Sequence, residues 1–140
     1  GSTLTTNFVT NGADIVFHAA GATGTGVISK AQEMGIMAIG VDSDQSILAP
    51  ETVITSAMKR VDNAVYATVE ALVNGTLEGG LAVFDINNGG VDIAPTTDLL
   101  TDDVIAAVEE VKAKLEAGEL TVPATAADFE AKDGDVYTLD

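Results

Sequence analysis

Three groups of polar residues directly follow apolar runs of the sequence and are placed to contact a small ligand. They are the glycine-rich segment 21–26, Asp42, and Lys59, which is one of only 6 lysines and arginines. A glycine-rich turn lets a ligand approach the backbone, and a helix that follows it offers free N–H groups to a phosphate, hydroxyl or carbonyl. A carboxylate accepts two hydrogen bonds from a vicinal diol such as that of a ribose. Lys59 can donate to a ligand hydroxyl or ring nitrogen, or pair with Asp42.

Each group also has a purely structural interpretation. The glycines suit a tight strand-to-helix turn, Asp42 suits a loop cap, and Lys59 suits a surface position. Phe17 and His18 precede the glycine turn and face opposite sides of the predicted strand. Phe17 is either a core residue or a stacking platform for a base, and His18 is either a polar residue at the rim of the core or a ligand contact.

Short apolar strands alternate with amphipathic helices, which favours right-handed crossovers and a mostly parallel sheet. We predict strands at 13–20, 37–41 and 52–56, and helices at 3–10, 27–34, 61–73, 101–117 and about 126–131. Asn87 and Gly90 bound a turn between apolar runs 81–86 and 91–94, which predicts a late β-hairpin. The predicted fold is therefore α/β, a three-layer, Rossmann-like or flavodoxin-like sheet. In such sheets ligands bind beyond the carboxyl ends of the strands, where all three polar groups fall.

The composition excludes several classes of function. The formal net charge is −16, so no cationic surface is expected to meet nucleic acid or an anionic membrane. There is no cysteine and one histidine, which excludes a thiolate site and makes a histidine-rich metal centre implausible. No apolar run has the roughly 18 residues of a membrane helix, and the start of the chain lacks the pattern of a signal peptide. We expect no cofactor.

An NAD(P)-binding oxidoreductase is the main alternative. A strand, the Gly21-x-x-Gly24-x-Gly26 turn, a helix and then Asp42 resemble a dinucleotide-binding fingerprint. However, Val27 stands where the pattern needs its last glycine, and neither tyrosine has a lysine four residues further on, as a short-chain dehydrogenase requires.

Four segments resemble the BMP (basic membrane protein) family of substrate-binding lipoproteins of ABC importers, which have a type I periplasmic-binding fold. Residues 12–27 (GADIVFHAAGATGTGV) are similar to the family's GADVIF-x-x-AGGTG-x-GV, with Ala22 in place of a glycine. Residues 39–45 (IGVDSDQ), 54–65 (ITSAMKRVDNAV) and 89–94 (GGVDIA) are similar to later family motifs, in the family's order.

The resemblance implies that the longer parent protein binds a nucleoside, chiefly a purine nucleoside, between two lobes, and is not an enzyme. Asp42 would hold the ribose hydroxyls, with Lys59 beside it. Gly21 and its neighbours, among them Thr23 and Gly24, would line the sugar pocket, and Phe17 would lie near the base. The implied partner is an ABC permease, and the implied location is extracytoplasmic, as a membrane-anchored lipoprotein.

The resemblance also implies that the chain is an incomplete protein. We interpret residues 1–2 as a cloning scar, 3–123 as an incomplete second (C-terminal) lobe and 124–140 as a tail. The first lobe and the opening strand of the second would be absent. A sheet without that strand exposes unpaired hydrogen-bonding groups, so a third hypothesis is a self-associating half-domain, a homodimer formed through the sheet edge.

Overall fold

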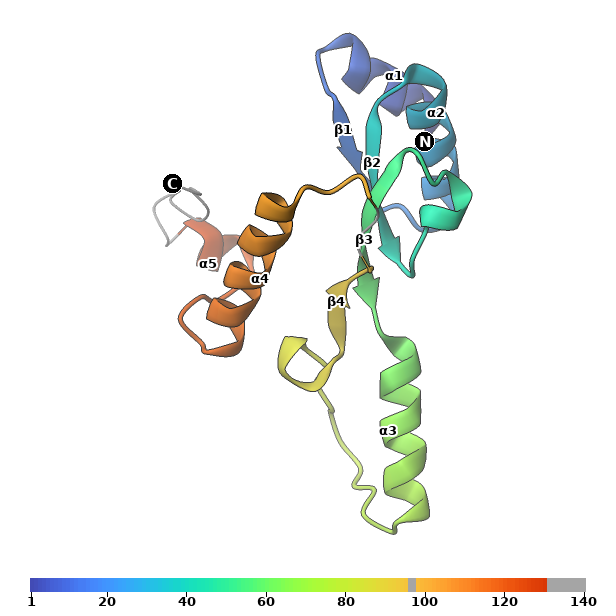
Figure 1. Ribbon diagram of the computed structural model, residues 1–140. Helices are drawn as coiled ribbons and strands as arrows, with labels where there is room; N and C mark the ends of the chain where they lie inside the picture. The colour runs from blue at the N-terminus through green and yellow to red at the C-terminus, as the bar shows by residue number, and fades with distance from the viewer. Residues whose placement is uncertain (96–97, 131–140) are drawn as a thin grey trace.

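The computed structural model describes residues 1–95 and 98–130 (Figure 1). The strands are β1 (Ile15–Phe17), β2 (Met37–Asp42), β3 (Val53–Lys59) and β4 (Val91–Ile93); the α-helices are α1 (Ser2–Thr10), α2 (Gly24–Met34), α3 (Val61–Val73), α4 (Asp102–Glu116) and α5 (Ala126–Glu130). Short 3-10 turns occupy Gly21–Thr23 (η1), Ser46–Leu48 (η2) and Ile86–Asn88 (η3). The predicted α/β alternation is confirmed. Helix α2 begins three residues earlier than predicted, β3 continues through Lys59, and β1 is shorter than the predicted strand 13–20.

The strands form one sheet in the order β1-β2-β3-β4. The first three are parallel, and β4 pairs antiparallel with β3. The carboxyl ends of β2 and β3 therefore lie side by side, with Asp42 opposite Met58. This register brings Asp42 next to Lys59.

The predicted hairpin between 81–86 and 91–94 is wrong. Residues 81–85 form no strand, and β4 takes Lys59 and its neighbours in β3 as partners instead. Gly89 does adopt the left-handed conformation expected of this turn, with φ +72°. It ends the 3-10 turn η3, whose Asp85 accepts a hydrogen bond from the Asn87 N–H.

Helices α1 and α2 pack together over one face of the sheet (Figure 1). The core lies under them: Val16, Ile28, Ala31, Ala38, Ala49 and Val53. On the opposite face, Ile15 and Phe17 are 46% and 62% exposed. Helix α4 faces that side at β3 and β4 across an apolar hollow of about 640 Å³, which gives the predicted three layers.

Helix α3 extends from the end of β3 away from the rest of the molecule (Figure 1). None of its residues is buried. Its apolar residues Val61, Val65, Val69, Leu72 and Val73 have exposed fractions between 52% and 79%. An amphipathic helix gains most of its stability by packing its apolar face, and that face has no packing partner among the described residues. Within the same residues, no helix is long and apolar enough to cross a membrane.

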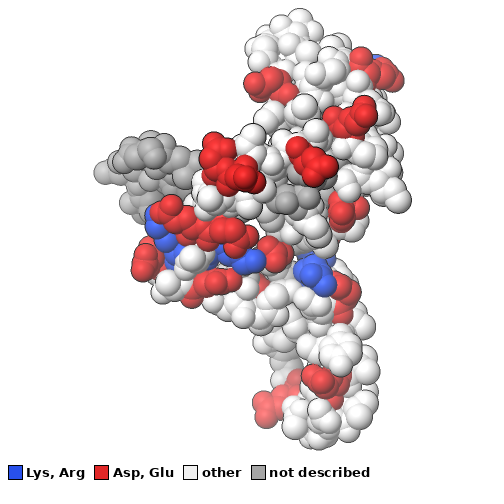
Figure 2. Space-filling view, in the orientation of Figure 1, with Lys and Arg blue, Asp and Glu red and all other residues white. Residues whose placement is uncertain are grey.

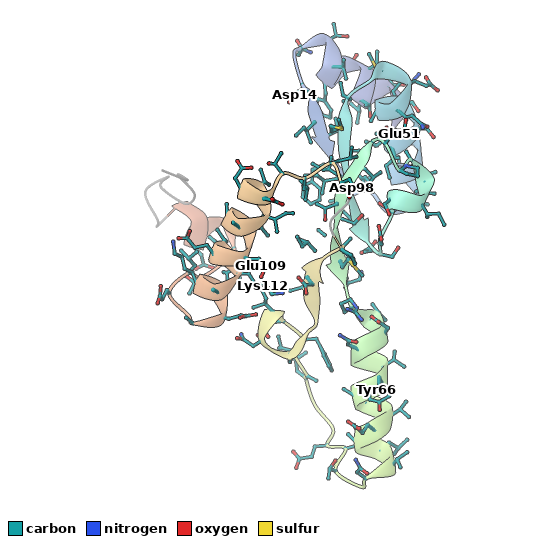
Figure 3. All side chains as sticks on the ribbon, viewed as in Figure 1. Asp14, Glu51, Tyr66, Asp98, Glu109 and Lys112 are labelled. Carbon is teal, nitrogen blue, oxygen red and sulfur yellow. The ribbon has the colours of Figure 1, made fainter. Side chains whose placement is uncertain are left out.

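An ion pair joins α4 to β4. Lys112 Nζ lies 3.1 Å from both carboxylate oxygens of Asp92, and Figure 3 shows Lys112 on the side of α4 that faces β4. Partial burial raises the pKa of Asp92, but hydrogen bonds from Lys112 and from the Ile93 N–H outweigh it and leave the pKa below its usual value. The hydrogen bond to Asp92 raises the pKa of Lys112.

We expect this pair to make the stability of the fold depend on acid pH. Because the folded pKa of Asp92 is lowered, its contribution is complete above the unfolded value of about 3.9 and is lost as the pH falls through the folded value. The thermal midpoints of the wild type and of Asp92→Asn should therefore differ at pH 6 and converge towards pH 3. A difference that stays constant over this range would contradict the assignment.

Candidate functional site

Asp42 and Lys59 form an ion pair where β2 and β3 end. The Lys59 Nζ lies 3.1 Å from the Asp42 Oδ1, and both side chains are more than half exposed. They border a hollow of about 600 Å³, which is lined by Asp42, Ser43, Met58, Lys59, Arg60, Val61 and Asp62. An exposed carboxylate beside a cation in a hollow is open to a ligand that offers hydroxyl groups.

The neighbouring cation is already engaged. The Arg60 Nη2 lies 2.8 Å from the Asp62 Oδ2, and its Nε donates to the same carboxylate. This hydrogen bonding lowers the pKa of Asp62. Lys59 is therefore the cation directed at Asp42.

The backbone at Asp42 is strained. Its φ is +68°, and among the described residues no other non-glycine has a positive φ. The Ser43 N–H donates to the Val41 carbonyl at 2.8 Å, which closes a γ-turn centred on Asp42. The form with positive φ is the rare, strained one. Strain of this kind persists only where the surroundings impose it, and it gathers at ligand sites.

The glycine turn has the geometry expected of a strand-to-helix connection. Gly21 has φ +52°, a conformation that favours glycine. A Cβ on Gly24 would come within 2.1 Å of the His18 Cε1 atom. Glycine at position 24 is thus required by the packing of His18, whereas Thr23 beside it is exposed.

Phe17 and His18 face opposite sides of β1, as predicted. Phe17 is 62% exposed, and His18 is 5% exposed. The His18 Nε2 lies 3.0 Å from the Oε1 of Gln45, a residue to which the sequence patterns assigned no role. Its membership of the IGVDSDQ motif was the only available signal.

Five of the seven predicted site residues border two hollows, and Gly21 and Gly24 border neither of them. Asp42 and Lys59 border the one described above, while Phe17, His18 and Thr23 border a second, of about 450 Å³, next to α1. The structure pairs Asp42 with Lys59 in an ion pair. The other predicted site residues lie in or directly after β1, or in the glycine turn. In the described ranges, no three histidine or acidic side chains gather closely enough to hold a metal ion.

A mostly parallel sheet with helices on both faces and polar groups at its strand ends is an α/β architecture of the class that binds ligands at this edge. Residues 1–126 match the family described as ABC transporter substrate-binding protein PnrA-like. The chain belongs to this family.

Individual relatives carry different names. Basic membrane protein D of Borreliella burgdorferi is 47% identical over 87 residues, which are 60% of this chain and 26% of that protein. The transcriptional activator protein Med of Bacillus subtilis is 36% identical over 110 residues, 78% of this chain and 35% of that protein. An ABC transporter solute-binding protein from Aeropyrum pernix superposes with a TM-score of 0.78 at 22% identity, over 96% of this chain and 47% of that structure. The chain thus spans less than half the length of each.

Proposed function

We propose that this chain is part of a longer substrate-binding protein that binds a purine nucleoside, with Asp42 holding the ribose hydroxyls. The strained turn at Asp42 is the observation that carries the proposal, because it holds a carboxylate at a strand end beside Lys59 and over an open hollow. An ionised carboxylate makes stronger hydrogen bonds to hydroxyls than a neutral acceptor does. Calorimetry with guanosine, adenosine and their free bases tests the proposal, since the bases lack the diol.

The remaining roles follow the family resemblance. Gly21, Thr23 and Gly24 line the sugar side, and Phe17 lies towards the base, with His18 as a further candidate contact beside the glycine turn. In the longer protein, the portion outside this chain supplies the other wall of the cleft. That protein delivers its ligand to an ABC permease outside the cytoplasm, anchored to the membrane as a lipoprotein.

The protein carries out no reaction on its ligand and binds no nicotinamide cofactor. We expect titration of NADH into the 140-residue chain to give no saturable rise in fluorescence at micromolar cofactor, because Val27 replaces the last glycine of the dinucleotide pattern. Saturation in that range would favour the oxidoreductase alternative.

Direct binding to DNA is not proposed, although one relative is named a transcriptional activator. On the face shown in Figure 2, acidic residues occur over most of the molecule, whereas basic groups gather mainly near α4 and the junction of β3 with α3. A formal net charge of −16 repels the phosphate backbone that dominates such binding.

We also propose that the isolated chain forms a homodimer. Among the described residues, the outer edge of β1 and the apolar face of α3 are two surfaces that a second copy of the chain can cover. The edge is only three residues long and offers few hydrogen bonds, each worth about 1 kcal/mol net. The α3 face offers five large apolar side chains and should contribute more.

A further inference from the structure

We propose that Gln45 is a positioning residue for the Asp42 carboxylate and that it acts together with His18 and Ser56. The effect on ligand affinity rests on the proposed function. The hydrogen bonds that hold the turn do not depend on any ligand. None of these three residues borders the hollow next to Asp42 and Lys59. Their effect on a ligand there would pass through the backbone of the turn.

The Gln45 side chain links His18, which follows β1, to β2, and the backbone N–H of Gln45 adds a hydrogen bond to β3. Its Oε1 accepts from the Val41 N–H at 2.9 Å, and it lies 3.0 Å from the His18 Nε2. The Gln45 N–H donates to the Ser56 Oγ at 3.1 Å. His18 directly follows β1, Val41 lies in β2, and Ser56 lies in β3. One amide therefore ties the glycine turn to the turn that carries Asp42.

The network is buried and closely fitted. His18 is 5% exposed and Ser56 is 0% exposed. A Cβ on Gly40 would come within 2.4 Å of the Ser56 Oγ and 2.8 Å of the Gln45 Oε1. A Cβ on Gly24 would overlap the His18 ring in the same way. Glycines 24 and 40 are thus the residues that make room for this network.

The shared oxygen also fixes the histidine tautomer. Because the Oε1 of Gln45 already accepts from the Val41 N–H, it must accept from His18 as well, so the His18 Nε2 carries the proton. The Nδ1 of His18 is then a buried lone pair, with no partner within the described residues.

The same oxygen holds the strained turn. Gln45 fixes the Val41 N–H, and the carbonyl of Val41 accepts from the Ser43 N–H to close the γ-turn at Asp42. An isolated residue would relax from φ +68° to an extended conformation, because that conformation has a lower free energy for any residue with a Cβ. Without Gln45, we expect the Asp42 carboxylate to move away from Lys59.

A selectivity measurement separates positioning from general stability. In the longer protein, Gln45→Met should weaken guanosine binding by about tenfold, yet leave the affinity for 2′,3′-dideoxyguanosine nearly unchanged, because only the diol needs Asp42. Gln45→Glu keeps an acceptor oxygen and should retain most of the preference for the diol. Gln32→Met, the same change at an exposed position of α2, is the matched control. Equal losses for both ligands, or Gln45→Glu behaving as Gln45→Met, would overturn the inference.

A double-mutant cycle with Asp42→Ala adds a second criterion. If Gln45 acts through Asp42, Gln45→Met should cost little further guanosine affinity once Asp42 is alanine. Additive losses would mean that Gln45 acts elsewhere.

A ligand-free measurement keeps this inference separate from the proposed function. His18 is the only histidine, so its ring nitrogens can be assigned by nitrogen-15 NMR in the 140-residue chain. We expect the Nε2-protonated tautomer in the wild type, a mixture in Gln45→Met, and a changed backbone coupling constant at Asp42. If these changes occur while the longer protein binds no nucleoside, the proposed function fails and the positioning role stands. An unchanged coupling constant at Asp42 would overturn the positioning role.

Discussion

Replacing Asp42 with alanine in the longer protein that contains this sequence should lower its affinity for guanosine by roughly tenfold to several hundredfold. The carboxylate is expected to accept two hydrogen bonds from the ribose diol, and charge-assisted bonds contribute about 1.5–3 kcal/mol each. Alanine keeps the Cβ, so the variant leaves the steric strain of the backbone at φ +68° in place and removes only the carboxylate. Calorimetry at constant salt measures the loss directly.

Two neighbouring positions calibrate this result. Asp44→Ala should change affinity little, because Asp44 Oδ1 accepts from the Ser46 N–H at 2.9 Å and serves as a loop cap. Lys59→Ala should cost less than Asp42→Ala if the lysine touches one hydroxyl, and more if it also balances the charge of Asp42 in a closed cleft. If Asp42→Ala binds guanosine as tightly as the wild type, Asp42 is only a turn residue and the proposed function is wrong.

The isolated 140-residue chain is expected to be dimeric by light scattering at micromolar concentration, and the double variant Val65→Ser, Val69→Ser is expected to be monomeric. These side chains are 57% and 52% exposed on α3. Burying a valine side chain contributes about 1.5–3 kcal/mol. Two such residues in each of two helices account for a large share of a micromolar association, which corresponds to about 8 kcal/mol.

Matched variants locate the interface. Thr68→Ser changes α3 without touching its apolar face and should leave the mass unchanged. Phe17→Lys places a charge on the exposed edge strand β1, which opposes pairing of edges. If Phe17→Lys alone abolishes the dimer, the sheet edge is the interface. A monomeric wild type over a hundredfold range of concentration would refute self-association altogether.

The sequence by itself determined the order and type of the main elements. The apolar run before the glycine turn, the valines spaced along 61–73 and the acidic start of the 102–116 helix are local signals, and each produced the element that it predicts. The hairpin failed because Asn and Gly permit a turn but do not create a partner strand. Residues 81–85 and β3 were alternative pairing partners for Val91–Ile93, and Val91–Ile93 pairs with β3.

Sequence reasoning also selected Asp42 and Lys59, because strand ends of a parallel sheet meet at one edge. It could not supply the pairing distance of 3.1 Å, since that depends on the register of β2 against β3 and on the unexpected extension of β3 through Lys59. It likewise could not divide the predicted residues between two hollows, because that division depends on where α1 and α3 lie.

Composition, spacing and family motifs thus determined the class of fold and the residues worth testing. Only the tertiary structure decided that Gln45 joins His18 to the Asp42 turn, that glycines 24 and 40 make room for these contacts, and that α3 has no packing partner. The physical reason is one of range. Periodicity and turn propensity act between residues a few positions apart, whereas the His18–Gln45 hydrogen bond, the Asp42–Lys59 ion pair and the contact of Gly40 with Ser56 join residues far apart in the sequence and exist only once the sheet has formed.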